Sequence, residues 1–143
     1  MQVVRSDIRL QSSDFRWYTK LMQDVSEFQI YKRAIELLPP IYELADTLPR
    51  SERELRSQLC NAAKSISAQI AEGFGKKNSQ VEFKRFLYMA LGSSDETITH
   101  LRQIDVLRLS DGKSCTRLIE AYRAESKQIN ALIQTIKHRI ADV

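Results

Sequence analysis

The chain has 143 residues, of which 43% are hydrophobic and 28% charged, and its formal net charge is +4 at pH 7. This length and composition fit one globular domain with its own core and exclude a disordered chain. Only four glycines and three prolines are present, too few for the tight turns of an all-β fold, and no apolar run approaches the ~20 residues that span a bilayer.

The first 24 residues form a predicted N-terminal extension, separate from a helical domain at residues 25–143. Within it, residues 14–22 can form a short amphipathic helix with Trp17, Tyr18 and Leu21 on its apolar side. Because termini are poorly ordered unless they are tied down, this stretch fits either an arm that covers one end of the domain or a mobile tail. It lacks the apolar core of a signal peptide, so we expect a cytoplasmic protein without membrane contact.

The first predicted helix covers residues 26–48, where apolar residues recur at spacings of three and four. Pro39 and Pro40 interrupt it, because proline lacks an amide donor and crowds the preceding turn, at a local cost of about 3 kcal/mol. The apolar pattern continues in phase beyond them, so we expect one kinked helix that ends at Pro49. The predicted inward positions are Tyr31, Ala34, Ile35, Leu38, Ile41, Tyr42, Ala45 and Leu48.

The second and third predicted helices cover residues 51–74 and 79–109, and both begin at capping-box patterns. In each pattern a serine, Ser51 or Ser79, precedes a glutamate by three residues, so that the hydroxyl can accept from the glutamate amide. Gly75 is a natural left-handed terminator of the second helix.

Small residues on both helices predict a close contact between them. A hairpin that turns near residues 77 and 78 brings Ser65 level with Ala90 and places Gly92 at the contact. We therefore expect extra volume at Gly92 to be strongly destabilising, because overpacking a close helix contact costs about 1–3 kcal/mol or more.

The fourth predicted helix covers residues 114–140, after a turn signal at residues 110–112. Glu125 and Ser126 fall where its apolar stripe would continue, so its middle is expected to be more polar. Three short turns between long helices predict an all-α fold, an up-down-up-down antiparallel four-helix bundle that follows the N-terminal extension.

Signals for catalysis are missing from the sequence. His100 and His138 have no ligand or nucleophile at useful spacing, and there is no HExxH motif or glycine-rich phosphate loop. We expect no catalytic residue, metal or cofactor. Cys60 and Cys115 fit buried free thiols, with a disulfide or a metal pair as the alternative.

Positive charge is concentrated in one part of the chain. Residues 1–49 carry a net charge of −1, residues 50–85 carry +4 and residues 86–143 carry +1. A local basic surface attracts a polyanion, and the helix N-terminus at Ser79 also favours an anion. The alternative is a solvated helix face that binds nothing. The candidate nucleic-acid-binding residues are Arg50, Arg53, Arg56, Lys64, Lys76, Lys77, Lys84 and Arg85, with Arg117, Arg123 and Lys127 as a second set.

Four sequence blocks carry a family resemblance. PRSE at residues 49–52, LRSQLCNAAKSI at 55–66, IAEG at 70–73 and EFKRFLYMALGS at 82–93 resemble the bacterial 23S ribosomal RNA intervening-sequence proteins, a four-helix-bundle family. The resemblance covers about residues 28–140, and IAEG and FLYMALGS are its most specific parts. Members look like products of reading frames carried in insertions within 23S rRNA genes.

The resemblance implies a ring-shaped homopentamer of four-helix protomers. It extends in fold to the accessory variability protein of diversity-generating retroelements, in which a basic surface engages nucleic acid and the reverse transcriptase. We therefore expect a non-catalytic protein that binds RNA or other nucleic acid. The alternative is a structural or protein-interaction scaffold such as a reverse-transcriptase accessory protein. Phe28, Ile30, Leu37 and Val106 fall off the predicted stripes and add apolar surface for assembly.

Overall fold

The computed structural model describes residues 23–141, with side chains described as far as residue 136. This part of the chain is helical and contains no strand, which confirms the predicted all-α class; the helix expected at residues 14–22 lies outside it. The elements are the 3-10 turns η2 (Val25–Glu27) and η3 (Arg50–Glu52) and the helices α2 (Gln29–Glu36), α3 (Leu38–Asp46), α4 (Arg53–Gly75), α5 (Gln80–Val106) and α6 (Gly112–Ala141).

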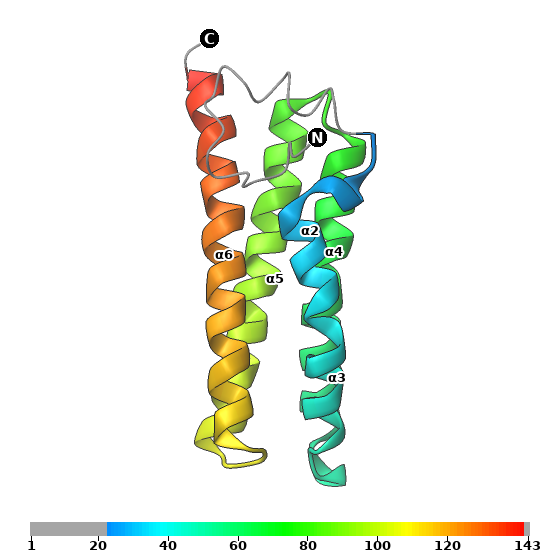
Figure 1. Ribbon diagram of the computed structural model, residues 1–143, viewed down its shortest axis with the longest axis vertical. Helices are drawn as coiled ribbons and strands as arrows, with labels where there is room; N and C mark the ends of the chain where they lie inside the picture. Colours follow the sequence, from blue (N-terminus) through cyan, green and yellow to red (C-terminus); the bar gives the residue numbers. More distant parts are fainter. Residues whose placement is uncertain (1–22, 142–143) are drawn as a thin grey trace.

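The helices form an antiparallel four-helix bundle in which α2 and α3 together make the first arm. The α4–α5 turn lies at the top of the molecule in Figure 1, and the α3–α4 and α5–α6 turns lie at the bottom. The most extensive packing joins α4 to α5 and α5 to α6, while α2 and α3 pack mainly on α4 and also meet α6. None of the described helices combines the length and the apolar composition needed to cross a bilayer.

The two prolines interrupt the first arm without dividing it. α2 ends at Glu36, and α3 carries Pro39 and Pro40 in its first turn, where a missing amide donor is tolerated. Leu37 between them keeps a right-handed conformation, and its amide donates to the Arg33 carbonyl oxygen at 3.0 Å. The arm is therefore one kinked unit, as predicted.

The first arm is rotated from the prediction, so that only part of the predicted face is buried. Ala34, Ile41, Ala45 and Leu48 are buried as predicted. Ile30 and Leu37, expected outside the stripe, are buried together with Phe28, whereas Ile35 and Tyr42, expected inside, are 42% and 38% exposed. The Phe28 ring packs edge-on against Phe74 and Phe83, with centroid distances of 5.4 and 6.0 Å. This anchor sets the rotation of α2, so three of the four residues assigned to assembly belong to the protomer core; the fourth, Val106, is exposed.

Neither predicted capping box is complete: the second forms its serine cap, but the Glu82 carboxylate bonds to Arg85, and the Ser79 amide donates to the Lys76 carbonyl oxygen instead. Ser79 accepts a hydrogen bond from the Glu82 amide at 3.2 Å and caps α5. Ser51 lies instead within η3, and α4 begins at Arg53 without a side-chain cap, so the prediction for Ser51 is wrong. Pro49 opens a 3-10 turn in which the Glu52 amide donates to the Pro49 carbonyl oxygen at 2.9 Å. Ser51 lies inside this turn, whereas a capping serine must lie just outside a helix with an extended backbone.

The left-handed helix end is at Arg108, not at Gly75. Among the described residues no glycine has a positive φ, and Gly75 is the last helical residue of α4. Arg108 has φ of 53° just after α5, and the Leu109 amide donates back to the Ile104 carbonyl oxygen at 3.0 Å. This bond closes the C-terminus of α5 in the manner of a Schellman motif.

The register of the α4–α5 hairpin is shifted by three residues from the prediction. Ser65 donates to Ser93, with 2.7 Å between the hydroxyl oxygens, so it is level with Ser93 and not with Ala90. α5 therefore begins about one helical turn beyond the end of α4. As a result Gly92 is exposed, and a Cβ added to it would have no atom of the described residues within 4 Å, so its predicted close contact is wrong.

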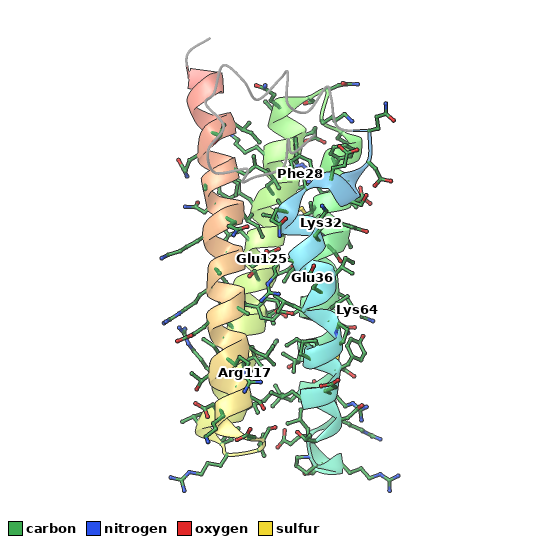
Figure 2. The ribbon with its side chains drawn as sticks, in the orientation of Figure 1. Phe28, Lys32, Glu36, Lys64, Arg117 and Glu125 are labelled. Carbon is green, nitrogen blue, oxygen red and sulfur yellow. The ribbon has the colours of Figure 1, made fainter. Side chains whose placement is uncertain are left out.

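A polar layer crosses the bundle at mid-height, as the interrupted stripe of the last helix predicted. Glu125 of α6 is 1% exposed and lies at this height in Figure 2. Beside it the Ser126 hydroxyl donates to Ser94 at 2.8 Å, and the Ser94 hydroxyl donates to the Tyr122 carbonyl oxygen at 3.3 Å. Apolar layers above and below this polar layer form the rest of the core.

Candidate nucleic-acid interface

The eight basic residues predicted as a nucleic-acid interface fall into separate groups. Arg50, Arg53 and Arg56, the lower group, lie at the α3–α4 end, while Lys76, Lys77, Lys84 and Arg85, the upper group, lie at the α4–α5 end. The rise of an α-helix separates Arg53 from Lys76 by about 35 Å. Lys64 lies between the groups, well below Phe28 in Figure 2. The structure therefore does not bring the eight residues into one cluster.

Neighbouring carboxylates offset the positive charge of the lower group. Arg56 forms an ion pair with Asp46 across the α3–α4 junction, and both side chains are exposed. Glu52 and Glu54 are neighbours of the three arginines along the chain. Three carboxylates thus balance three guanidinium groups, and the α3–α4 junction offers little net attraction to an anion.

In the upper group, cationic side chains lie on aromatic faces. The Lys76 Nζ atom is 5.3 Å and the Arg85 Cζ atom 4.5 Å from the centroid of the Phe86 ring. The Lys77 Nζ atom is 3.8 Å from the centroid of the Phe74 ring. These cation–π contacts restrict long side chains that would otherwise be mobile, and they hold three positive charges at one end of the bundle.

Two carboxylates moderate the charge of the upper group. Arg85 donates from Nε to Glu82 at 2.9 Å, and this hydrogen bond lowers the pKa of the Glu82 carboxyl and raises the pKa of Arg85. Glu72 of α4 also raises the pKa of Arg85 by its charge. Residues 76–85 themselves carry four basic side chains against one acidic side chain, a net charge of +3. The first-turn amides of α5 point towards the same end, so they add to the positive potential.

A second basic surface is a groove of about 680 Å³ between α5 and α6. It brings Arg123 and Lys127 of the second predicted set together with Arg102 of α5. The sequence did not identify Arg102, because its proximity to the other two depends on how α5 pairs with α6. Asp95 and Glu120 line the same groove, which leaves a net charge of +1. Arg117 instead lines a cavity of about 220 Å³ between α3 and α6 and appears in the lower half of Figure 2.

Among the described side chains, the other reactive residues are engaged or buried; His138 lies outside them. His100 is within hydrogen-bond distance of Glu96 (3.2 Å) and Gln103 (3.0 Å) on its own helix. Cys60 and Cys115 are buried free thiols, as predicted, and burial raises the pKa of both, which disfavours the nucleophilic thiolate. The described residues contain no group of three or more His, Cys, Asp or Glu side chains that could hold a metal ion.

Comparison with known proteins identifies a family for this fold. The family model described as 23S rRNA-intervening sequence protein matches residues 26–131, which include α2 to α5 and most of α6. No curated protein matches the chain. The matched range includes the whole upper group and the α5–α6 groove, so both candidate surfaces belong to the shared domain.

Proposed function

The chain belongs to the 23S rRNA-intervening sequence protein family, and we propose that it is a non-catalytic protein that binds nucleic acid through the upper group. The observation that carries the proposal is the net charge of +3 within residues 76–85, held beside the α5 N-terminus by Phe74 and Phe86. The family description refers to a ribosomal RNA gene, so structured RNA is the first nucleic acid to test.

Binding of this kind depends on phosphate contacts. Each neutralised phosphate releases a counterion, so the logarithm of the binding constant falls with the logarithm of salt concentration by about 0.9 per contact on a duplex. Phosphates carry no base identity, so the upper group alone gives weak sequence preference and strong salt dependence.

The proposal includes self-association into a ring-shaped homo-oligomer, a homopentamer by family resemblance. Ile35, Tyr42, Tyr88 and Met89 are large apolar or aromatic residues that the protomer leaves exposed, which supports an interface between copies. A cyclic assembly repeats the upper group around one rim, so several weak contacts act on the same RNA.

The test compares two variants with equal changes of charge. In the upper variant Lys76, Lys77, Lys84 and Arg85 are replaced by glutamate; in the control Arg50, Arg53, Arg56 and Lys64 are replaced by glutamate. We expect the upper variant to lose binding to an rRNA fragment, measured by fluorescence anisotropy at several salt concentrations. The control is expected to retain most of its affinity, and a single upper substitution to flatten the salt slope by about one unit.

Equal loss of affinity in both variants would show that only total charge matters and would refute a local interface. If binding persists in the upper variant, the upper group is not the interface, and the groove with Arg102, Arg123 and Lys127 is the next surface to test. Circular dichroism of each variant checks that the helices remain intact.

A protein-interaction scaffold is the second candidate, and the exposed apolar residues favour it. On this proposal the partner is a protein, such as the reverse transcriptase of a diversity-generating retroelement. If the purified protein retains neither rRNA fragments nor duplex DNA at about 50 mM salt, where phosphate contacts are strong, the scaffold replaces the nucleic-acid proposal. The genomic neighbourhood, an rRNA operon or a reverse transcriptase gene, separates the two contexts.

A further inference from the structure

We propose that two defined faces of the protomer bind each other in the assembly. The α5 face, which consists of Tyr88, Met89 and Gly92, packs on the α2–α3 face of a second copy, which consists of Tyr31, Ile35, Leu38 and Tyr42. This inference rests on the self-association included in the proposed function and names the surfaces that make it.

Gly92 provides the first indication, because nothing in the described part of the protomer requires a glycine there. It lies inside α5, where glycine is less favourable than alanine because it loses more backbone entropy and has no side chain to pack. A Cβ at Gly92 would have no neighbouring atom within 4 Å, whereas one at Gly73 would be 3.0 Å from the Cβ of Phe86. A glycine on an exposed helical surface allows the backbone of another helix to approach closely, and none of the described helices of the protomer occupies that position.

The residues around Gly92 are also unusual for a surface that faces water. Tyr88 and Met89 precede it by about one turn and are 44% and 42% exposed. The missing side chain at Gly92 leaves a depression beside an aromatic and a flexible apolar side chain. Such a surface is expected where one helix packs on another.

The complementary surface lies on the first arm. Ile35 and Tyr42 are 42% and 38% exposed, and the half-buried Tyr31 and Leu38 continue their stripe. The first arm packs on α4 and α6, and α5 makes no extensive contact with it among the described residues. The two faces therefore lie at opposite corners of the bundle, so each copy can receive one neighbour and dock on another. Such a heterologous contact closes into a ring when the rotation permits.

The two faces are also at the same height along the bundle. Phe28 contacts Phe83, with 6.0 Å between ring centroids, which fixes the start of the first arm relative to α5. Both elements then run downwards in Figure 1 with the same rise per residue. Ile35 lies seven residues after Phe28, and Met89 and Gly92 lie six and nine residues after Phe83. Two copies side by side at the same height thus place Ile35 of one copy opposite the space beside Gly92 of the other.

The area available approaches that of a specific contact when the neighbouring helix is included. The first arm from residue 29 to 46 is about 27 Å long, and the partner's α5 can also cover the adjoining surface of α4, so the footprint is about two helix diameters wide. This footprint has a flat area of about 600 Å², compared with the ~800 Å² per partner that standard-sized interfaces bury.

The test measures molar mass by light scattering after size exclusion, without nucleic acid, for the wild type, Gly92→Leu and Ile35→Glu. Gly75→Leu is the control, because Gly75 also has no atom within 4 Å of an added Cβ but lies on neither face. We expect an oligomer for the wild type and the control, and a monomer of 16.5 kDa for each face variant. Circular dichroism is expected to show unchanged helix content, since both sites are exposed.

Mixing the two monomeric variants identifies which faces meet. Each retains one intact face, so an equimolar mixture is expected to give a 1:1 complex and nothing larger. A wild-type monomer overturns the proposed self-association itself. A wild-type oligomer that survives both substitutions, or a mixture that remains monomeric, overturns the pairing of these faces while leaving self-association in place.

Discussion

Gly73 and Gly92 lie on the two helices of one hairpin, and the structure gives them opposite environments. A Cβ at Gly73 would be 3.0 Å from the Phe86 Cβ and 3.1 Å from the Phe83 Cδ1, whereas a Cβ at Gly92 would contact nothing within 4 Å. Gly73 is buried where α4 crosses α5, and Gly92 faces outwards from α5.

The different surroundings of the two glycines suggest different reasons for the absence of a side chain. A glycine inside a helix costs about 1 kcal/mol relative to alanine, so it persists where a side chain would obstruct packing. At Gly73 the obstruction is inside the protomer, where two phenylalanine side chains fill the space that a side chain would need. At Gly92 no described atom occupies the corresponding space, which is why we propose the outer face of α5 as the surface for a second copy.

Gly73→Leu is expected to have the largest effect on stability. Its side chain cannot fit between α4 and Phe83 and Phe86 without moving backbone, so we expect a loss of about 3 kcal/mol and a melting temperature lower by about 10 °C. Thermal unfolding followed by circular dichroism measures it. A melting temperature within about 2 °C of wild type, less than the shift for 1 kcal/mol, would mean that the two helices do not approach at this point.

The Ser65–Ser93 hydrogen bond tests the register that buries Gly73 and exposes Gly92. A double-mutant cycle with Ser65→Ala and Ser93→Ala is expected to give a coupling energy of about 1 kcal/mol in urea unfolding, because the two hydroxyls bond only in this register. Ser57→Ala, an exposed position on α4, paired with Ser93→Ala is the control and should show no coupling. Equal coupling in both pairs would contradict the register.

Gly92→Ala should change stability in the opposite direction from Gly73→Leu. In an Ile35→Glu background, where the proposed contact is removed, we expect a gain of about 0.5–1 kcal/mol from helix propensity alone. Chemical unfolding at several protein concentrations measures it and confirms that association does not contribute. A loss of stability in this background would place Gly92 against another part of its own protomer.

Glu82 provides the smallest effect, through its exposed ion pair with Arg85 in the first turns of α5. The Arg85 hydrogen bond lowers the folded-state pKa of Glu82, so the stabilisation is complete above the unfolded pKa of about 4.3 and is lost as pH falls through the folded value. We therefore expect Glu82→Gln to lower the melting temperature slightly at pH 7 and not at all well below about pH 4. The same decrease at both pH values would show that the carboxylate charge is irrelevant.

The sequence by itself determined the helical class, the approximate helix bounds and the proline interruption, because these depend on local backbone preferences and on the spacing of apolar residues. It also identified the Ser79 cap, whose donor and acceptor are three residues apart, and the polar middle of α6, since Glu125 falls within an otherwise apolar stripe. The upper group was recognisable for the same reason, because its four basic residues lie within ten residues of chain.

Only the tertiary structure decided how each helix is rotated and how far it is shifted along its neighbour. On the first arm apolar residues cover more than one face, so periodicity alone could not choose between Ile35 and Leu37 for the core until Phe28 packed on Phe74 and Phe83. The hairpin register depends on the geometry of a short turn, and a shift of three residues moved Gly92 from the contact to the surface. Distance along a helix separated the lower from the upper group, because charges that belong to one basic stretch of sequence can be a bundle length apart in space.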